Sequence, residues 1–369
     1  MAFRLSAFYF TFFAYAGAYV AYFPLYLADR GLSAPEIAGV LALPAIARIF
    51  APAAWGWLAD ASGAHRGIVA FSCAITAAAF AALPFTSHIA WVIAAMSVLS
   101  VGALPLIEAI TLASLAGESG RYGPIRLWGS IGFIAVLLAG GAWLDLQPVA
   151  TLPAVIVLLN LASLAVALTL PVVQPSASSR SGHFRLPRGA PALFGVGFCN
   201  AVAHGALYAF LTLHLERLGY SASSIGMLWT AGVLAEIVVF FYLPQLFRRC
   251  ALSTILAASA ACALARFLAI GWAAHELWIV LSAQLLHAAT FGAFHAAAVA
   301  AVHRLFSENA HARGQTLFSS VTYGAGAAAG LVIAGWAWQA GGAPLAFSVS
   351  ALAGLSGAFF AVQLKRAGL

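Results

Sequence analysis

Apolar runs long enough to cross a membrane follow one another along the whole chain, and they constrain its fold most strongly. A helix needs about 20 mostly apolar residues to cross about 30 Å of hydrocarbon. Twelve runs meet this length: 5–27, 37–58, 67–86, 90–115, 122–144, 149–170, 191–214, 223–246, 252–274, 277–302, 315–339 and 345–364. Only 7% of the 369 residues are charged, against about 25% in soluble domains. The sequence therefore predicts an all-α membrane protein with twelve transmembrane helices.

A polar stretch at 172–190 divides the runs into two sets of six. Its Pro, Ser, Gly and Arg residues are typical of a flexible linker. We expect six-helix bundles at 1–171 and 191–369, joined by a cytoplasmic linker.

The basic residues predict the orientation of these bundles. With the N-terminus inside, twelve of the 17 Lys and Arg residues fall in inside-facing segments, and only Arg30 and Arg217 face outside. Cytoplasmic loops carry such an excess of positive charge, so both termini are expected in the cytoplasm and the chain in the cell (inner) membrane. Despite the formal charge of +7, the basic residues are too scattered to follow nucleic-acid phosphates, and no nucleic-acid partner is expected.

The two halves of the sequence repeat each other. A shift of 188 residues places Gly31-Leu-Ser-Ala34 over Gly219-Tyr-Ser-Ala222, and a shift of 190 places Leu127 over Leu317 and Phe133 over Tyr323. Six spans separate the copies, so both copies have the same orientation, as in parallel repeats related by an axis along the membrane normal. The repeat predicts pseudo-twofold symmetry with a cavity between the bundles.

Ionisable residues inside the apolar runs are the candidate functional residues, because a charge near the bilayer centre costs at least about 2.5–3.5 kcal/mol on insertion scales. They are Arg48, Glu108, Arg126, Glu236 and Arg266, accompanied by His204, His287 and His295. Internal ion pairs that only hold helices together are the alternative interpretation. Three Arg against two Glu leave a net positive charge, which favours an anionic cargo.

Two softer patterns extend the candidate binding site. Asn200, His204 and Tyr208 recur every four residues on one helix face and are predicted to line the cavity. Tyr19 belongs to an aromatic stripe on the first run that would stack on an aromatic cargo or face lipid.

No motif in the sequence predicts covalent chemistry. His275-Glu276 lacks the second His of a zincin, and no Gly-rich loop precedes Lys-Ser or Lys-Thr. We therefore expect no enzyme, no catalytic residue, no metal site and no cofactor, with the proton gradient as the driving force.

The segment Gly56-Trp-Leu-Ala-Asp-Ala-Ser-Gly-Ala-His-Arg-Gly67 resembles the cytoplasmic loop motif of the major facilitator superfamily. The resemblance implies transport by alternating access, with Asp60 and Arg66 in a gate; Ala61 and Ala64 replace basic residues of the motif. Arg48, which the shift of 188 places over Glu236, is added to this gating group.

Three further segments resemble the phenylpropionate permease family within that superfamily: Leu41–Arg48, Tyr122–Phe133 and Gln284–His295. The chain also resembles, more distantly, the lactose permease group. That likeness implies that Glu108 and Arg126, eighteen residues apart, hold the substrate.

The same likeness implies that Glu236, Arg266 and His287 couple protons to transport. Thr290 stands where the group has a second Glu, so His295 is added to the coupling set.

Together these features predict a monomeric secondary transporter in the lipid bilayer that couples protons to a small-molecule substrate, a small organic anion such as an aromatic carboxylate. The predicted substrate-binding residues are Glu108, Arg126, Tyr19, Asn200, His204 and Tyr208. Two alternatives stay open: the same fold carrying a neutral sugar or nucleoside, and a membrane-embedded enzyme or receptor.

Overall fold

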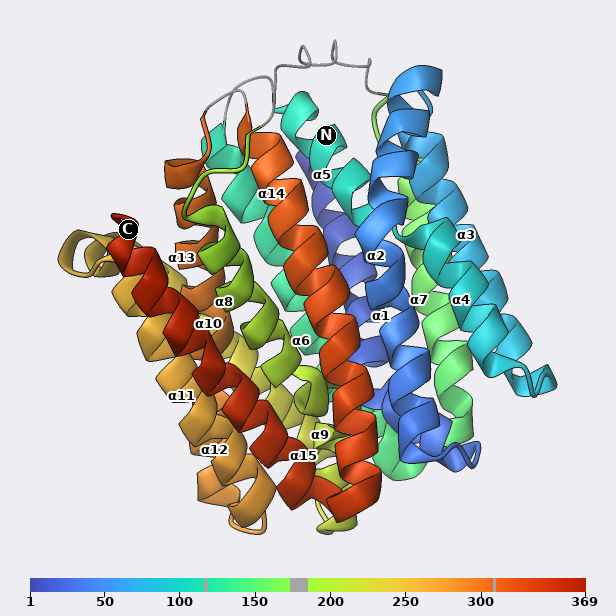
Figure 1. Ribbon diagram of the computed structural model, residues 1–369. Coiled ribbons are helices and arrows are strands. Elements are labelled where there is room, and N and C mark those ends of the chain that lie inside the picture. Colours follow the sequence, from blue (N-terminus) through green and yellow to red (C-terminus); the bar gives the residue numbers. More distant parts are fainter. Residues whose placement is uncertain (116–118, 173–184, 308–309) are drawn as a thin grey trace. The chain divides into compact units, whose positions relative to one another are not determined.

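The computed structural model describes residues 1–115, 119–172, 185–307 and 310–369, and within these ranges it is all-helical, with no strand (Figure 1). The all-α prediction is therefore confirmed for the described part of the chain. Most of the predicted linker at 172–190 lies outside the described residues, which resume at Arg185.

The described residues of the first half form seven α-helices: α1 (Ala2–Asp29), α2 (Ala34–Ser62), α3 (His65–Ala82), α4 (Ile89–Ser100), α5 (Ala103–Ser114), α6 (Tyr122–Leu146) and α7 (Leu152–Ala167). Short 3-10 turns join several of them: η1 (Leu83–Phe85), η2 (Ser119–Arg121) and η3 (Val149–Thr151). One predicted span, 90–115, corresponds to α4 and α5 in succession, with a turn at Val101–Gly102 between them.

The second half contains α8 (Ala190–Ala203), α9 (Gly205–Arg217), α10 (Ala222–Arg249), α11 (Leu252–Ala273), α12 (Leu277–Leu285), α13 (Phe294–Leu305), α14 (His311–Ser319) and α15 (Ala327–Arg366). Two π-helical turns interrupt it, η4 (Ala288–Ala293) between α12 and α13 and η6 (Ser320–Gly326) between α14 and α15. Such π-turns inside helices are frequent at functional sites.

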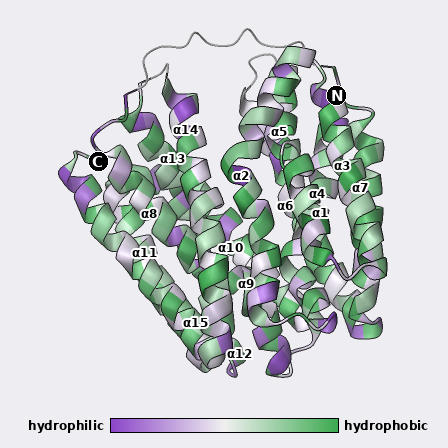
Figure 2. Cartoon of the chain, turned by 45° about the vertical axis from the view of Figure 1, so that its right-hand side comes forward, coloured by the Kyte–Doolittle hydropathy of each residue, from purple (hydrophilic) through white to green (hydrophobic). Residues whose placement is uncertain are grey.

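Eleven helical segments of the described chain are long and apolar enough to cross a membrane. The last, His311–Arg366, contains both final predicted spans. Its backbone leaves the helical region at Gly341 (φ −153°) and Gly342 (φ 66°), and the second of these angles is readily adopted only by glycine. The count of twelve spans therefore stays a prediction. Figure 2 shows helices that are largely hydrophobic, with hydrophilic residues gathered near many of their ends.

The described chain forms two compact units, each of which draws on both halves of the sequence. The first unit comprises Met1–Leu32, Ile46–Ser178 and Ser221–Met227; the second comprises Ser33–Ala45, Ser179–Tyr220 and Leu228–Leu369. The predicted boundaries of two six-helix bundles are not tested by this division and stay a prediction.

Glycine lets helix backbones touch inside each unit. In the first unit, a Cβ atom at Gly132 of α6 would overlap the carbonyl oxygen of Phe10 on α1. In the second unit, a Cβ atom at Gly205 of α9 would overlap the carbonyl group of Gly330 on α15. Small residues at such crossings give membrane helices their close packing, and these contacts fix α1 and α9 beside the polar clusters described next.

Candidate functional site

The most deeply buried charge in the described chain is Arg266 on α11, whose exposed fraction is 1%. One guanidinium nitrogen, Nη1, is 3.0 Å from Nδ1 of His287 and 2.9 Å from Oγ1 of Thr290. The other, Nη2, donates to Oε1 of Gln284 over 2.9 Å. Since the guanidinium only donates, Nδ1 of His287 must accept, and this imidazole is neutral with its proton on Nε2.

Gln284 fixes the position of the guanidinium. Its amide nitrogen donates to the carbonyl oxygen of Leu228 on α10 over 3.2 Å, while its amide oxygen accepts from Arg266. Both ends of the amide are thereby satisfied in a buried setting, where an unpaired polar group would cost about 1–3 kcal/mol. The amide therefore holds Arg266 at a set distance from α10.

Glu236 on α10 extends this network to a carboxylate. Its Oε2 lies 3.6 Å from Nε2 of His287, the nitrogen that carries the proton. The close approach of α10 depends on Gly292 in η4, because a Cβ atom there would lie 2.9 Å from Cγ of Glu236. A continuous line of polar groups thus runs from Arg266 through His287 to Glu236, and we call these three residues the coupling line.

His295 lies beyond an aromatic ring from the coupling line. Phe291 stacks on His287 at a centroid distance of 5.1 Å and on His295 at 6.3 Å. Nδ1 of His295 is 2.7 Å from the hydroxyl of Tyr323 in η6. Because a phenyl ring carries no exchangeable proton, His287 and His295 have no proton path through Phe291.

The predicted polar face of the seventh run lies partly inside the second unit. His204 is buried, and its Nδ1 is 2.8 Å from the backbone carbonyl oxygen of Asn200, while its Nε2 has no hydrogen-bond partner in the described chain. Tyr208 stacks on Trp229 at 6.4 Å, and Trp229 donates to Thr212 over 3.1 Å. Because the carbonyl oxygen only accepts, Nδ1 of the neutral His204 donates to it and Nε2 offers an unused acceptor, while Tyr208 offers a ring already packed on another ring.

In the first unit, Arg126 on α6 lies over aromatic rings. Its guanidinium carbon is 4.0 Å from the ring centroid of Phe13 and 5.4 Å from that of Tyr9. Glu108 on α5 is close enough to Arg126 to interact with it electrostatically. Glu108 and Arg126 are each only partly buried. Neighbouring side chains cover part of each residue, and the rest is accessible.

Two other predicted residues of the first unit differ in their surroundings. Tyr19 stacks on Phe23 at 5.0 Å and meets Phe80 edge-on at 6.2 Å, and its hydroxyl has no hydrogen-bond partner in the described chain. Arg48, which lies in an apolar run, is exposed. The sequence predicts that Arg48 faces either the protein interior or a water-filled cavity; its exposed side chain excludes the interior, and its role stays a prediction.

The gating residues predicted from the loop motif contact neighbours within the first unit. Oδ1 of Asp60 lies 3.2 Å from Nε2 of the buried His65, and Nη1 of Arg66 donates to the carbonyl oxygen of Leu170 over 3.4 Å. The Asp60 side chain is 58% exposed, and exposed pairs of this kind contribute about 0–1 kcal/mol. Such contacts are weak enough to form and break during function.

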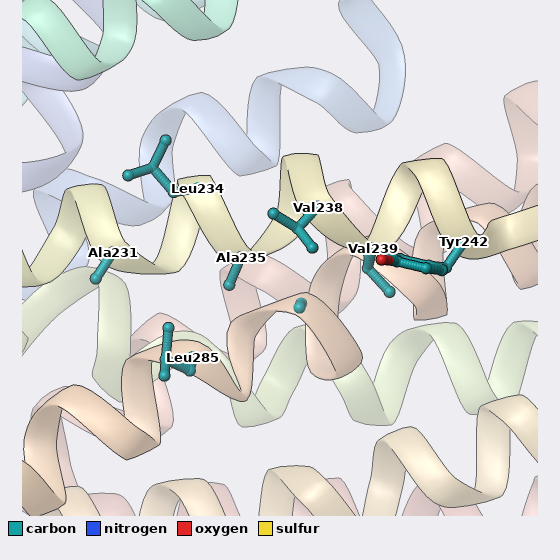
Figure 3. Close-up of a pocket in the computed structure, with 8 residues that line it drawn as sticks. Ala231, Leu234, Ala235, Val238, Val239, Tyr242 and Leu285 are labelled. Atoms are coloured by element: carbon teal, nitrogen blue, oxygen red, sulfur yellow. The ribbon is translucent and has the colours of Figure 1, made fainter.

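An open apolar groove of about 560 Å³ lies between α10 and α12 in the second unit. Ala231, Ala235, Val238 and Val239 line it from α10, and Leu285 lines it from α12 (Figure 3). Two lining residues, Ala235 and Ala288, are the chain neighbours of Glu236 and His287. Glu236 and His287 themselves do not line the groove.

Sequence reasoning identified the charged members of both clusters and missed their uncharged partners. Tyr9 and Phe13 lie on the first run among other aromatic residues, and only their spacing of four marks them as one face. Gln284 is a polar residue inside an apolar run, and that signal could have singled it out.

Long apolar helices with ionisable groups held inside them define a polytopic membrane protein of the transporter class. The comparison with known families agrees: residues 2–349 match the MFS_1 like family, and the chain belongs to this family of major facilitator transporters. The resemblance to the major facilitator superfamily is thereby confirmed.

Two curated relatives are similar over almost their whole length. A protein of Escherichia coli (strain K12) described as a "Probable 3-phenylpropionic acid transporter" is 29% identical over 350 residues, which cover 90% of this chain and 89% of the relative. The "Maltose permease" of Geobacillus stearothermophilus is 27% identical over 367 residues, which cover 94% and 91%. These relatives are transporters and not enzymes.

Solved structures share the fold at lower identity. The nucleoside transporter NupG aligns with a TM-score of 0.83 at 18% identity, covering 99% of this chain and 98% of that one. A POT family transporter in complex with 5-aminolevulinic acid aligns with a TM-score of 0.78 at 11% identity, covering 100% of this chain and 96% of that one. At these identities the likeness concerns the fold alone.

Proposed function

We propose that the protein is a proton-coupled symporter of a small organic anion, with an aromatic carboxylate similar to 3-phenylpropionate as the cargo. The observation that carries this proposal is the coupling line. A cation that is almost fully buried, a neutral imidazole and a carboxylate follow one another across three helical segments. Charges in such a setting rarely persist without a functional role.

The architecture that belongs to this proposal has twelve spans in two six-helix bundles. The break at Gly341 and Gly342 supports two spans within His311–Arg366, and the bias of Lys and Arg supports cytoplasmic termini in the inner membrane. Transport then proceeds by alternating access, in a monomer, with Arg48, Asp60 and Arg66 in the gate. The weak, exposed contact between Asp60 and His65 suits a gate that opens in each cycle.

Glu236 is the group that takes up the proton in this mechanism. While ionised, the carboxylate lies 3.6 Å from Nε2 of His287 and attracts the proton on that nitrogen, and it compensates the charge of Arg266 through the imidazole. Once protonated, it is neutral and loses that attraction, so α10 is no longer held electrostatically against α12. Arg266, fixed by Gln284 and Thr290, keeps its position and is left with an uncompensated charge, which favours the arrival of an anion.

Arg126 binds the carboxylate of the cargo in this mechanism. A guanidinium presents paired donors that match the two oxygens of a carboxylate, and Glu108 keeps it charged and oriented before the cargo arrives. Tyr19, Asn200, His204 and Tyr208 are the further substrate-binding residues of this proposal. His295 is placed beside Tyr323 and acts on the cargo rather than as a relay to His287.

The apolar groove supports a cargo with a ring. An aliphatic wall beside a charged network suits an amphiphilic anion better than a polyhydroxylated sugar, which needs several side-chain hydrogen bonds.

A neutral sugar or nucleoside is the second candidate cargo, favoured by the maltose permease relative and by the fold shared with a nucleoside transporter. Competition separates the two cargo classes. Excess maltose or uridine should leave the uptake of labelled 3-phenylpropionate unchanged, whereas excess benzoate-type carboxylates should reduce it. The opposite pattern would favour the neutral cargo.

The role of Glu236 is tested with purified protein in vesicles and labelled 3-phenylpropionate. Glu236→Gln should exchange internal for external cargo about as fast as the unmodified protein but should lose accumulation driven by an inward proton gradient. The matched control is Glu276→Gln, which neutralises an exposed carboxylate just before α12 and should preserve both activities. Full accumulation by Glu236→Gln would remove this residue from coupling.

A further inference from the structure

The repeated turn of the two halves begins two helices whose first turns are held in different ways. Gly31 and Gly219 both take left-handed backbone angles, with φ of 80° and 87°, and α2 and α10 follow them. The first turn of α10 belongs to the first unit and the first turn of α2 belongs to the second. Each helix start is thus packed among helices from the other half of the sequence.

A carboxylate from α6 caps the start of α10. Oδ1 of Asp145 accepts from the backbone N–H of Ala222 over 2.7 Å, and Oδ2 accepts from that of Ser223 over 3.2 Å. The first N–H groups of a helix have no partner within the helix, and an anion there also interacts favourably with the helix dipole. Asp145 therefore joins two spans that are far apart in sequence.

Close backbone packing accompanies this cap. A Cβ atom at Gly141 of α6 would lie 2.5 Å from the carbonyl oxygen of Ala222, and one at Gly226 of α10 would overlap that of Leu137. Tyr22 of α1 donates to the same Leu137 oxygen over 2.5 Å. The ends of α6 and α10 are therefore in direct contact, and Asp145 closes the contact at its solvent edge.

The equivalent contact in the second unit lacks the carboxylate and one of the two backbone donors of this cap. The shift of 190 places Gly335 where Asp145 stands, and the shift of 188 places Pro35 where Ser223 stands. Proline has no N–H to donate, and glycine has no carboxylate. A Cβ atom at Gly335 would lie 2.6 Å from Cβ of Ala38, so close packing holds this contact.

The start of α2 has its own cap instead. The backbone N–H of Ser33 donates to Oε2 of Glu36 over 2.8 Å, and the Ser33 hydroxyl donates to the same oxygen over 2.6 Å. The acid that caps α2 thus lies on α2, whereas the acid that caps α10 lies on α6. When α6 and α10 separate, the cap by Asp145 must break, whereas the cap of α2 by Glu36 stays within α2.

We propose that Asp145 is a one-sided latch of the transport cycle: it holds the ends of α6 and α10 together, and it must release Ala222 and Ser223 before that end of the protein opens. In the proposed topology this end faces outward, so the inference rests on the proposed function. Opening is then opposed by the Asp145 carboxylate at the contact of α6 with α10, whereas no carboxylate stands at the matching position of α15.

The latch is tested by measuring the separation of α6 and α10 directly. Leu146→Cys and Met227→Cys place spin labels on two exposed side chains, in a background in which Cys73, Cys199, Cys250 and Cys262 are replaced by Ala. Pulsed electron resonance then gives the distribution of distances. Asp145→Asn should raise the ratio of long to short distances about 5- to 10-fold, because charge-assisted hydrogen bonds are roughly twice as strong as neutral ones.

Three further variants separate the latch from other effects. Asp29→Asn neutralises an exposed carboxylate at the end of α1 and should leave the distribution unchanged. Ser223→Pro copies Pro35 of the other half, removes both the backbone N–H and the hydroxyl that Ser223 donates to Asp145, and should give a smaller shift because Ala222 still donates. The double variant of Asp145→Asn with Ser223→Pro should shift no further than Asp145→Asn alone, because residues that act through one contact are not additive. If Asp145→Asn is unstable, the same distance distribution is measured in Asp145→Ala.

Unchanged distances in both Asp145 variants would overturn the latch. A shift in the double variant equal to the sum of the shifts from Asp145→Asn and Ser223→Pro would also overturn it. The measurement needs neither cargo nor proton gradient. If the unmodified protein fails to couple protons to transport but the Asp145 variants shift the distances, only the proposed function is contradicted. If the unmodified protein couples protons to transport but the Asp145 variants leave the distances unchanged, only the latch is contradicted.

Discussion

Two arginines, one in each compact unit, lie within membrane-length helices in opposite circumstances. Arg266 is 1% exposed and donates to His287, Thr290 and Gln284. Arg126 is only partly buried, and its guanidinium lies over the rings of Phe13 and Tyr9. The terminal nitrogens of Arg266 are hydrogen-bonded to side chains. The guanidinium of Arg126 instead stacks on aromatic rings, which do not use its N–H donors.

The difference separates two tasks that a charge can perform inside a membrane. A guanidinium whose donors already bond to side chains cannot bind cargo without breaking those hydrogen bonds. It therefore suits the role of a fixed charge that responds when a neighbouring group gains or loses a proton. A guanidinium held by cation–π contacts retains its hydrogen-bonding capacity and suits direct recognition of an anion. We therefore expect changes at Arg266 to affect folding and coupling, and changes at Arg126 to affect cargo affinity.

The largest effect is expected for Arg266→Gln, on the stability of the folded protein. Removing the buried charge leaves Gln284, Thr290 and His287 without their hydrogen-bond donor, and breaking a buried charged network costs about 3–5 kcal/mol. Thermal unfolding of the purified protein in detergent should show a marked loss of stability. A stability equal to that of Arg126→Gln would remove the contrast between the two arginines.

Arg126→Gln should keep the fold and lose cargo affinity. A hydrogen bond to a charged group is worth about 1.5–3 kcal/mol, which corresponds to an increase of about 10- to 150-fold in the KM for an aromatic carboxylate. Arg126→Lys should recover part of the affinity, since it keeps the charge but not the paired donors. Initial uptake rates in vesicles measure both variants, and an unchanged KM in Arg126→Gln would exclude this residue from binding.

Gln284→Leu tests whether the network around Arg266 depends on its neutral members. The variant leaves the carbonyl oxygen of Leu228 without its donor and Arg266 without one acceptor, at a cost of about 1–3 kcal/mol. The control is Gln147→Leu, at an exposed position just after α6, which should unfold at the temperature of the unmodified protein. Equal unfolding temperatures for the two leucine variants would contradict the assigned role of Gln284.

The smallest effect is expected for Phe13→Leu, which removes the ring 4.0 Å from the guanidinium carbon of Arg126. Cation–π contacts at partly exposed sites contribute about 0.5–1 kcal/mol, so the KM for the carboxylate should rise about 2- to 5-fold. Phe3→Leu changes a ring that is 83% exposed and should leave the KM unaltered. An effect of Phe13→Leu on stability with no change in KM would make the ring a packing residue only.

The charged members of both clusters could be predicted from the sequence because a charge inside an apolar run is conspicuous. Glu236, His287 and Arg266 were assigned to one network by resemblance, and the structure brings them together. The partners Gln284 and Phe13 could not be predicted in the same way. Which side chain meets which depends on the rotation of each helix about its axis, and a uniformly apolar run carries no periodicity that fixes this rotation.

Interruptions of the helices were equally hard to foresee. The π-turns at Ala288–Ala293 and Ser320–Gly326 lie within longer apolar runs that carry no local signal for an interruption. The exposure of Arg48 likewise depends on which face of α2 is left uncovered. By contrast, the repeated turn at Gly31 and Gly219 was visible in the sequence, because left-handed backbone angles favour glycine.

The most direct test of coupling follows internal pH in vesicles that contain the purified protein while carboxylates, sugars and nucleosides are added in turn. The coupling line predicts that an aromatic carboxylate moves protons inward together with the cargo, that Glu236→Gln abolishes this movement and that Glu276→Gln preserves it. Proton movement that persists undiminished in Glu236→Gln, or that no member of the panel induces in the unmodified protein, would contradict the assignment.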